Sequence, residues 1–493
     1  MIQTTIDLVK EIAAQRKTEL RVVPLFWEYR PFRALLIPVY SSEKKYLGVW
    51  SPEKKIIFNE PWLEDTRVHN GQSFALYPFN YENFQLLSQE IPSLKPTAAG
   101  VKTSFGTGDR LGLVSSAHLT ALKKYDVFPI VAQQSPRELE KTGRTFQTVL
   151  VDAAWGVFMS GYQGIYGADA DHIKDESRLI QAIESGYSFY TLDVSEKVEK
   201  NALFKSEKEL VEAYQHLSLP QLTVYKRYLD QSFTLAEGFQ VDFRERNLLS
   251  ILLAYYPILD FIDRMNVLLD ERVSHYDLEI SLDEGDALTS FEAHFLVAEE
   301  LHRLGIDFQS LALKFPGSFE KGIDYLGDSN QFQENLRRQV VVGHNIGGYR
   351  LSLHSGSDKM SIYPIFSQET EGLFHVKTSG TSWLKALETV VVTYPDLFRK
   401  IYNLSIEELP ENRKAYQISL DANSLPDDLE YIPDKKLLDL MKADSIRQLL
   451  HISYGSILRD LREELYRVLF RYQDDHFQRV EKNIENHLEV LMK

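Results

Sequence analysis

From about residue 98 onward, short runs of apolar residues alternate with longer stretches in which apolar residues recur at helical spacing. Short strands that each precede a helix are the sequence pattern of βα units and of a parallel sheet. Eight such strands are predicted, within residues 102–108, 127–133, 166–171, 189–194, 276–283, 308–315, 350–356 and 373–380. Eight strands alternating with helices are the number that closes a (β/α)8 barrel, so the pattern predicts an α/β protein with a TIM barrel.

Several of the intervening stretches carry helix signals of their own. Apolar residues follow helical spacing within residues 116–125, 175–185, 290–305 and 382–394. The third of these stretches begins at Ser290, a residue type that caps helix N-termini, and ends at Gly305, which is typical of a helix C-terminus. Helices are therefore expected to surround the barrel.

The chain extends beyond the predicted barrel on both sides. Residues 1–20 predict an amphipathic helix, and residues 21–62 alternate apolar and turn-like segments as antiparallel hairpins do. The interval of about 197–274 is too long for one crossover connection and predicts a helical insertion after the fourth strand. The charged C-terminal region has helical apolar spacing and is expected to pack on the barrel or on a partner subunit. The expected organisation is residues 1–97 for a helix and hairpin extension, 98–406 for the barrel, and 407–493 for a helical extension.

The composition is that of a globular protein with an acidic balance. With 493 residues and 44% hydrophobic content, the chain can bury a large core. A net charge of -16 argues against nucleic acid and anionic membranes as partners, because binding to phosphates depends on clustered Lys and Arg. The longest apolar stretch, residues 248–262, contains Pro257 and Asp260 and is too short to span a bilayer. The N-terminus lacks the apolar core of a signal peptide, so a cytoplasmic protein acting on a small molecule is expected, with a homo-oligomer possible.

Histidines at strand ends suggest a metal site. The sequence contains no cysteine, so any metal must be held by His, Asp, Glu or backbone oxygen. His172 and His354 end separate predicted strands, where a parallel barrel carries its active site, and they predict a shared divalent cation. The alternative is two core histidines, each bonded to a backbone carbonyl. Glu320 is the predicted third ligand, with His375 in reserve, and such ligands accept Zn, Mn, Co or Ni.

Strand alternation separates polar from apolar residues on two of the predicted strands. The polar faces consist of Asp277, Glu279 and Ser281 on one strand, and of Arg350, Ser352 and His354 on the other. The apolar faces suit the helix layer, so the polar faces are expected to line the barrel interior, where an ionised group must pair, bind metal or face a wet site. For Glu279 the alternative to a functional role is a buried ion pair with Arg350.

Turns of small residues follow several strands, at residues 104–112, 354–359 and 376–382. Backbone N–H groups in such turns can bind an anion ahead of a helix, but glycine also occurs where a turn simply needs a positive φ. Lys321 is either a point charge for a substrate carboxylate or a surface lysine. The candidate substrate-binding residues are Arg110, Lys321, Ser355, Lys359, Thr378 and Ser379.

Taken together, six motifs resemble the tagaturonate epimerase family, bacterial enzymes that interconvert D-tagaturonate and D-fructuronate. The motifs are SFGTGDRLG, DADHIKD, LEISLDE, FPGSFEKGIDYLGD, HSGSDK and HVKTSGTS, and the resemblance covers nearly the whole chain. Their order is also distantly similar to that of class II metal-dependent ketose-bisphosphate aldolases. Those barrels carry an Asp-His pair, a glutamate in an LEIE-like strand, a His-Gly and an HGGSG.

The resemblance assigns roles to individual residues. Asp171 falls on the proton-transfer aspartate, His172 and His354 fall on two metal-binding histidines, and Glu279 falls on the strand glutamate. Lys321 and the glycine after it fall where the aldolases have their other His-Gly ligand. An ammonium is a poor metal ligand, so the third metal position moves to Glu320 or to another group. HSGSDK also lacks one glycine of the aldolase motif.

The resemblance implies an epimerase that uses a divalent metal and a hexuronate substrate. The two ketohexuronates differ at a carbinol carbon β to the ketone, which the carbonyl does not acidify, so a retro-aldol and aldol sequence is expected, with a hydride shift as the alternative. Asp171 and Glu279 are the expected acid/base pair. The rival functions are an aldolase-type lyase that releases both fragments, and a non-catalytic barrel that binds sugar acids.

Overall fold

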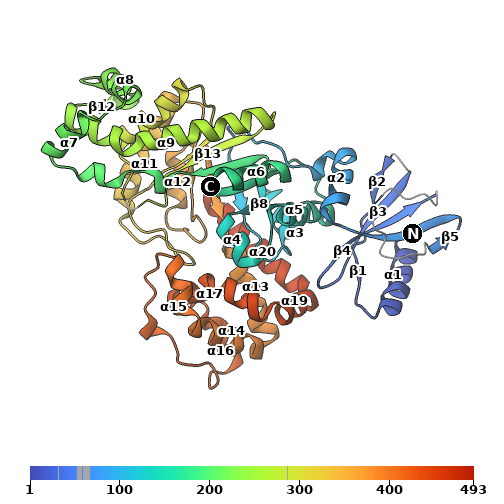
Figure 1. The fold of residues 1–493 in the computed structure, drawn as a ribbon. Coiled ribbons are helices and arrows are strands. Elements are labelled where there is room, and N and C mark those ends of the chain that lie inside the picture. Colours follow the sequence, from blue (N-terminus) through green and yellow to red (C-terminus); the bar gives the residue numbers. More distant parts are fainter. Residues whose placement is uncertain (31–32, 53–57, 59–66, 286) are drawn as a thin grey trace.

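The computed structural model of the chain describes residues 1–30, 33–52, 58, 67–285 and 287–493. Among these residues, eight parallel strands close into a barrel in the order β10-β13-β14-β15-β16-β7-β8-β9 (Figure 1). The strands are β7 (Ser104–Thr107), β8 (Phe128–Gln134), β9 (Gly167–Ile173), β10 (Phe189–Asp193), β13 (Asp277–Ser281), β14 (Ser310–Ala312), β15 (Arg350–Leu353) and β16 (Phe374–Thr378). Each of them overlaps one of the predicted stretches, with β8 and β9 extending one and two residues beyond theirs, so the predicted (β/α)8 barrel is confirmed.

Helices surround this barrel as the alternating pattern predicts. They are α3 (Ser115–Leu122), α4 (Pro136–Thr142), α5 (Phe146–Ser160), α6 (Glu176–Ser185), α10 (Phe291–Arg303), α11 (Ser329–Ile346), α12 (Tyr363–Glu369) and α13 (Thr381–Thr393). The hydroxyl of Ser290 accepts a hydrogen bond from the backbone N–H of Ala293 and so caps α10 as expected. Gly305, just beyond that helix, has a φ of 78°.

The interior of the barrel is polar, as the alternation of residues in the strands predicts. Thr191, Glu279, Ser310 and Arg350 lie side by side on consecutive strands, and all are buried. At the N-terminal end of the barrel, the carboxylate of Asp277 accepts hydrogen bonds from two backbone N–H groups of the segment that precedes β7. This segment closes that end, so the polar interior meets the solvent at the C-terminal ends of the strands.

The predicted insertion after the fourth strand is present and is mainly helical. Its elements are η3 (Ser195–Lys197), η4 (Lys200–Phe204), α7 (Glu207–Tyr214), α8 (Leu219–Tyr228), β11 (Ser232–Thr234), η5 (Ala236–Gly238), β12 (Gln240–Asp242) and α9 (Glu245–Arg272). The pairing of β11 with β12 was not predicted from the sequence. In Figure 1 the insertion extends from the barrel on the side opposite to the N-terminal sheet.

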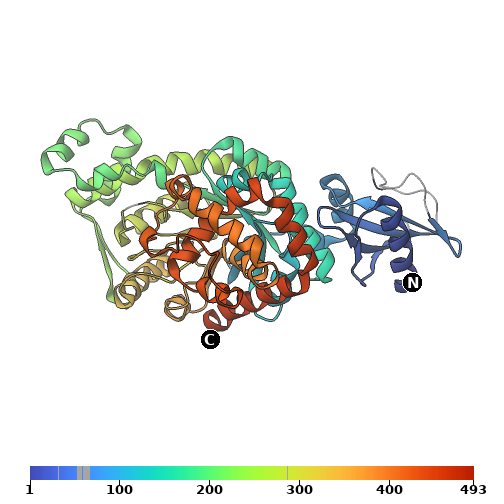
Figure 2. The ribbon, with the colours of Figure 1, turned by 90° about the horizontal axis from the view of Figure 1, so that it is seen from below.

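The C-terminal region packs on the barrel, which was one of the two alternatives expected for it. Its elements are α14 (Pro395–Glu407), α15 (Leu409–Asn412), η6 (Arg413–Ala415), η7 (Ala422–Ser424), α16 (Asp434–Leu440), α17 (Asp444–Ile452), α18 (Tyr454–Asp460), α19 (Arg462–Arg471) and α20 (Gln473–Leu491). The last helix, α20, packs against α3, α12 and α13 of the barrel layer. Most of the others share a hydrophobic core with the outer face of α13 and lie in front of the barrel in Figure 2.

The N-terminal region forms an antiparallel sheet covered by a helix. Its elements are α1 (Ile2–Arg16), β1 (Arg21–Val22), β2 (Trp27–Tyr29), β3 (Ala34–Tyr40), β4 (Lys45–Ser51), β5 (Arg67–His69), β6 (Gln72–Pro78), α2 (Tyr81–Glu90) and η2 (Pro92–Leu94). The predicted helix and the predicted hairpin of β3 and β4 are confirmed. Of the predicted strand segment 54–62, all but Phe58 lies outside the described residues. Strands β5 and β6 extend the sheet beyond the predicted hairpins.

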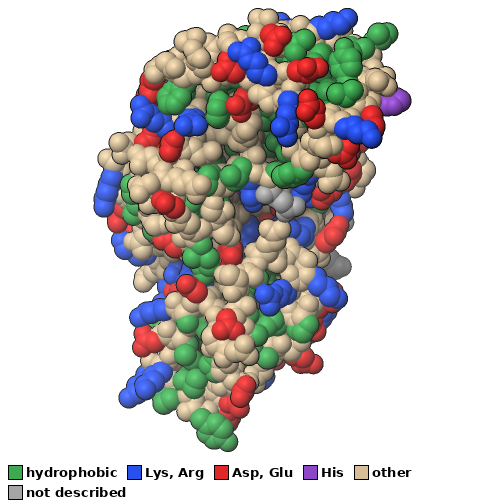
Figure 3. All heavy atoms as spheres, turned by 90° about the vertical axis from the view of Figure 1, so that its left-hand side faces the viewer, with side chains coloured by type: hydrophobic (Ala, Val, Ile, Leu, Met, Phe, Trp, Pro, Cys, Tyr) green, Lys and Arg blue, Asp and Glu red, His purple; other side chains and the backbone are tan. Residues whose placement is uncertain are grey.

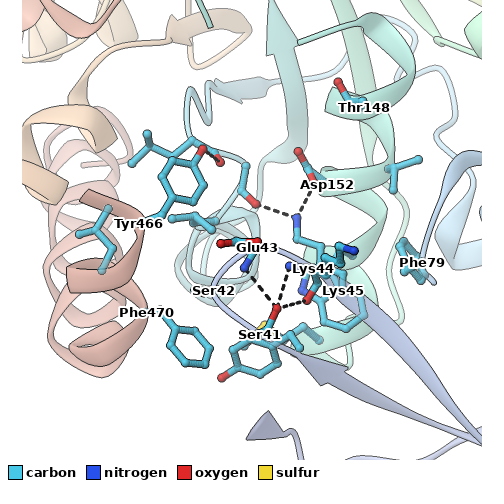
Figure 4. Close-up of a pocket in the computed structure, with 18 of the residues that line it drawn as sticks. Ser41, Ser42, Glu43, Lys44, Lys45, Phe79, Thr148, Asp152, Tyr466 and Phe470 are labelled. Atoms are coloured by element: carbon cyan, nitrogen blue, oxygen red, sulfur yellow. Dashed lines mark hydrogen bonds and ion pairs between the residues drawn. The ribbon is translucent and has the colours of Figure 1, made fainter. Parts of the chain in front are cut away.

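The turn between β3 and β4 reaches the barrel and lines a cavity of about 490 Å³ together with α5, α19 and α20 (Figure 4). Lys45 forms an ion pair with Asp152 of α5, and its Nζ donates a hydrogen bond to the carbonyl of Gly112 at 2.7 Å. Asp152 also pairs with Arg144. This network connects the N-terminal sheet to the loop that follows β7.

The outer surface carries interspersed charges. On the face shown in Figure 3, acidic and basic side chains alternate without a continuous patch of one sign. Within the described parts of the chain, every helix is too short or too polar to cross a membrane.

Replacing Lys45 with Met is expected to lower the free energy of unfolding by about 2 kcal/mol, because Asp152 then loses a partner in a mostly buried network. The measurement is denaturant unfolding followed by circular dichroism. The exposed neighbour Lys44 provides the control, and Lys44→Met should change stability by no more than about 0.5 kcal/mol. Equal small effects of the two substitutions would contradict the role assigned to Lys45.

Candidate active site

A cavity of about 480 Å³ opens at the C-terminal ends of the barrel strands. This is the end at which parallel barrels carry their active sites, because side chains from several strands converge there. The charged and polar side chains that line it include Arg110, Arg137, Glu138, Asp171, His172, Asp283, Glu284, Glu320, Lys321, His354, Ser355, Lys377, Ser379 and Tyr416.

A β-bulge in β9 brings Asp171 and His172 to the same cavity. Tyr190 of β10 pairs with Ala170, whereas Leu192 pairs with Ile173, so Asp171 and His172 together oppose the single residue Thr191. His172 has a φ of 53°, a left-handed conformation that is uncommon for residues other than glycine. In a regular strand, neighbouring side chains point to opposite faces, and the bulge removes this constraint.

The two predicted metal-binding histidines meet at this end of the barrel. The ring centroids of His172 and His354 are 5.0 Å apart. A hydrogen bond of 2.7 Å joins His172 Nδ1 to Asp171 Oδ1, and one of 2.6 Å joins His354 Nε2 to Glu279 Oε1. The remaining ring nitrogens face the carboxylate of Asp283, with His354 Nδ1 at 2.9 Å and His172 Nε2 at 4.0 Å from its Oδ1.

This arrangement fits a divalent cation. His172, His354 and Asp283 each offer a ligand atom, and these atoms lie within 4.8 Å of one another. Each imidazole uses its other nitrogen to bond a carboxylate, which is how metal-binding histidines are usually oriented. Asp193 and Glu284 form a second such group with His172, so further carboxylate oxygens lie nearby. The donor set of two imidazoles and a carboxylate is one that Zn, Mn, Co and Ni all accept.

Lys377 of β16 lies at the centre of the polar interior. Its Nζ is 2.7 Å from Asp169 Oδ2, 2.7 Å from Asp171 Oδ1 and 2.8 Å from Glu279 Oε1. The side chain is 3% exposed, so these ion pairs are shielded from water. Lys377 therefore fixes the two carboxylates that hold the histidines.

The charges of this cluster depend strongly on one another. Burial opposes ionisation, but Lys377 holds the pKa of Glu279 well below its usual value. Burial also opposes protonation of the imidazoles, yet Asp171 raises the pKa of His172 to about 10, and Asp283 raises that of His354 to about 9. The carboxylates of the cluster thus favour a positive charge at the position of the two histidines.

The predicted third metal ligand, Glu320, lies elsewhere in the cavity wall. Its Oε2 accepts hydrogen bonds from the backbone N–H and hydroxyl of Ser419 and from the amide of Gln448, and its Oε1 accepts one from Ser318. The structure places Asp283, and not Glu320, beside the histidines. The reserve ligand His375 is buried in the interior, where its Nδ1 is hydrogen-bonded to the hydroxyl of Ser104.

The predicted catalytic carboxylates differ in their access to the cavity. Asp171 lines it, whereas Glu279 is fully buried behind His354. The alternative proposed for Glu279, an ion pair with Arg350, is replaced by the ion pair with Lys377.

The predicted substrate-binding residues fall into two groups. Lys321, Ser355 and Ser379 line the cavity, and Lys321 Nζ donates a hydrogen bond to Ser355 Oγ at 2.8 Å. Lys359 is fully buried, and its ammonium donates to the backbone carbonyls of Glu320, Ile323 and Ser357.

The other two candidates are also occupied within the fold. The hydroxyl of Thr378 donates to the carbonyl of Gly106. Arg110 lines the cavity, but its Nε and Nη2 donate to Glu138 and its Nη1 donates to the carbonyl of His451. Lys359 and Thr378 thus shape the cavity from behind instead of facing a ligand.

Two glycines at the end of β7 are needed because neighbouring atoms leave no room for a side chain. A Cβ atom on Gly106 would lie 1.8 Å from Gln133 Oε1, and one on Gly108 would lie 2.6 Å from the Cα of Ser379. Positive φ, the alternative for these turns, occurs at neither of these glycines but does occur at Gly112, whose φ is 69°. The loops after β7 and β16 therefore need glycine in order to touch.

Sequence reasoning missed several residues of the cavity. Asp283 continues the alternation of Asp277, Glu279 and Ser281, and Lys377 follows His375 on an inward face, so both carried a usable signal. Tyr416 comes from the C-terminal region, and nothing in its local sequence points to the barrel.

Comparisons with known proteins give one consistent result for the chain as a whole. A family model described as tagaturonate epimerase matches residues 32–491. The chain is 42% identical over 423 residues to a tagaturonate/fructuronate epimerase of Thermotoga maritima, covering 85% of this chain and 87% of that protein. A glycerol-complexed crystal structure of fructuronate-tagaturonate epimerase UxaE from Cohnella laeviribosi superposes with a TM-score of 0.90 at 31% identity, covering 99% of both chains. The native crystal structure of that protein gives a TM-score of 0.88.

Replacing Lys377 with Met is expected to lower the free energy of unfolding by about 3–5 kcal/mol, because buried carboxylates then lack a cation. Denaturant unfolding measures the change, with the exposed Lys400→Met as a control that should cost no more than about 1 kcal/mol. Adding Asp169→Asn to Lys377→Met should recover part of the loss, since it removes one of the unpaired charges. A stability equal to that of the control would contradict this account of the cluster.

Proposed function

Because the chain belongs to the tagaturonate epimerase family, we propose that it interconverts D-tagaturonate and D-fructuronate with the help of a divalent cation. The observation that carries the metal dependence is the meeting of His172, His354 and Asp283 at the mouth of the barrel. A cation bound by these residues would supply a Lewis acid for the ketone of the substrate and its neighbouring hydroxyl.

The position of the epimerised carbon favours a retro-aldol route. The two sugars differ at a carbinol carbon that is β to the ketone, and the carbonyl does not acidify the hydrogen on that carbon. Breaking the bond between the α and β carbons sends its electron pair toward the ketone, while the β hydroxyl loses its proton and becomes an aldehyde. Rotation of the aldehyde and reversal of the step give the epimer, and every atom of the substrate is retained.

Asp171 is the proposed base for the β hydroxyl. It lines the cavity beside His172, and Lys377 helps to keep its carboxylate ionised. A positioned carboxylate that accepts a proton in one direction returns it in the other, which a reversible epimerisation requires.

Glu279 is the proposed second member of the acid/base pair. Its carboxylate lies behind His354, and the hydrogen bond to the imidazole connects it to the cavity. One of its oxygens, Oε2, has no hydrogen-bond partner within the described parts of the chain. This free oxygen can accept a proton while Oε1 keeps its contacts with His354 and Lys377.

Substrate contacts are proposed for the cavity-lining residues Lys321, Ser355 and Ser379. Lys321 has donors beyond the one given to Ser355, and a substrate oxygen can accept them. Arg110, Lys359 and Thr378 are proposed to support the loops that carry these contacts.

Incubation of the purified protein with D-tagaturonate should give D-fructuronate as an isomeric product, followed by proton NMR. Prolonged treatment with a chelator should abolish turnover, and Zn, Mn, Co or Ni should restore it. Release of a three-carbon aldehyde would indicate a lyase instead. Turnover that survives exhaustive chelation would contradict the metal dependence.

Asp171→Asn and Glu279→Gln should each reduce turnover roughly 100-fold or more, the usual contribution of a general acid or base. Metal content, measured by elemental analysis, separates two roles for each residue. Retained metal with lost turnover supports proton transfer, whereas lost metal shows that the carboxylate serves to orient its histidine. Lys400→Gln, at an exposed lysine that pairs with Glu464, is the control and should retain the activity.

A further inference from the structure

One wall of the cavity, named here the cationic wall, presents the side chain of Arg137, with Lys141 on the same helix outside the cavity lining. The carboxylates of Glu138 and Glu284 also line the cavity. Helix α4 supplies Arg137 and Lys141, and their positions four residues apart place them on one face of the helix. The guanidinium of Arg137 lies 5.2 Å and the ammonium of Lys141 lies 4.4 Å from the ring centroid of Tyr416. The hydroxyl of Tyr416 accepts a hydrogen bond from Lys141 Nζ at 3.4 Å and donates a long one to the hydroxyl of Tyr454 at 3.3 Å.

Tyr416 belongs to a strap, residues 415–419, that crosses the mouth of the barrel. At one end of the strap, Ala415 and Tyr416 contact Arg137 of α4, which follows β8. At the other end, Ser419 is bonded to Glu320, which follows β14. Strands β8 and β14 lie on opposite sides of the closed barrel, so the strap spans the opening. Ala415, Tyr416 and Gln417 line the cavity from above.

Arg137 is the cavity-lining arginine whose donors are least occupied. Among the described residues, its polar contacts are with the carbonyl of Ala415 and with Glu284 Oε1, both at 3.5 Å, in addition to the ring of Tyr416. Arg110, in contrast, gives two hydrogen bonds to Glu138 and one to a backbone carbonyl. The side chain of Arg137 is 42% exposed and lines the cavity, so its guanidinium N–H groups can donate hydrogen bonds to a ligand.

Arg137 is also close to the reacting end of the site. Glu284 Oε1 lies 3.5 Å from Arg137 Nη2 and 3.7 Å from His172 Nε2, so one carboxylate oxygen bridges the two residues. A ketohexuronate has a ketone near one end and a carboxylate at the other, separated by three carbinol carbons. A ligand of this length reaches from the histidines to the cationic wall.

We propose that Arg137 and the hydroxyl of Tyr416 bind the carboxylate of the substrate and thereby select uronates over neutral ketoses. This inference rests on the proposed function. The guanidinium group matches a carboxylate through two parallel hydrogen bonds, and the phenol of Tyr416 adds a third donor by turning its O–H from Tyr454 to the ligand. Although burial acts in the opposite direction, Arg110 and Lys141 lower the pKa of Tyr416, which makes its hydroxyl a stronger donor to an anion.

This assignment places the carboxylate away from Lys321, the residue for which a carboxylate was expected from the sequence. Lys321 follows β14, on the opposite side of the barrel from α4, and its ammonium already bonds Ser355. The two cations therefore serve opposite ends of the substrate, with Lys321 bonding its hydroxyl groups.

The test compares D-tagaturonate with D-tagatose, in which a hydroxymethyl group replaces the carboxylate. D-Tagatose is tested both as a substrate and as a competitive inhibitor of D-tagaturonate conversion. Arg137→Gln should lower kcat/KM for D-tagaturonate roughly 10- to 100-fold, mainly through KM, and should leave the affinity for D-tagatose unchanged. Arg137→Lys should restore part of the loss, because it returns the charge without the fork. Tyr416→Phe should also lower the preference for D-tagaturonate over D-tagatose, by a smaller factor than Arg137→Gln.

Lys414→Gln is the matched control, since Lys414 is an exposed cation next to the strap that pairs with Glu411. It should leave the preference for the acid unchanged. Equal weakening of both sugars by Arg137→Gln, or no weakening of either, would overturn the inference. A loss of preference in Lys321→Met but not in Arg137→Gln would assign the carboxylate to Lys321 and would also overturn it. Failure of the wild-type protein to convert D-tagaturonate would instead refute the proposed function itself, before any variant is compared.

Discussion

The site depends on one buried ammonium. Lys377 binds the carboxylates of Asp169, Asp171 and Glu279 in the interior of the barrel, where an unpaired charge of either sign would be costly. Two of these carboxylates in turn hold the imidazoles of His172 and His354. Lys377 thus sets the orientation of the proposed metal ligands through these carboxylates, from β16, three strands away from both β9 and β13. Because these groups are buried away from water, each contact of the network is electrostatically stronger than it would be at the surface.

Much of the architecture followed from periodicity. Eight short apolar runs alternating with helical stretches predicted the barrel, and the positions of His172 and His354 at strand ends predicted that they would meet. Strand alternation also placed Glu279 and Arg350 in the interior. These features depend on local sequence and on the general geometry of parallel barrels, which is why they could be predicted.

The remaining features depend on contacts between distant segments. Glu320 looked like the third metal ligand because it follows a strand, but Ser419 and Gln448, about a hundred residues later, engage its carboxylate. The motif that contains Lys377 has the composition of an anion-binding turn, so the local sequence does not indicate a buried ion pair there. The strap and the cationic wall combine α4 with the C-terminal region, and no local pattern connects these two segments. The roles of Glu320, Lys377 and the strap thus depend on which distant segments lie beside them, and not on their residue types alone.

The bulge in β9 has a consequence for how such a strand can change. Because Asp171 and His172 share one position opposite Thr191, the strand holds one residue more than regular pairing needs. Loss of a single residue there would give a smoother ladder and relieve the left-handed backbone at His172, yet it would turn one of the two side chains toward the helices. A regular β9 and a complete site therefore exclude each other at this point of the chain. A natural deletion that removed the bulge would leave a well-folded barrel that lacks one of the two side chains in its cavity.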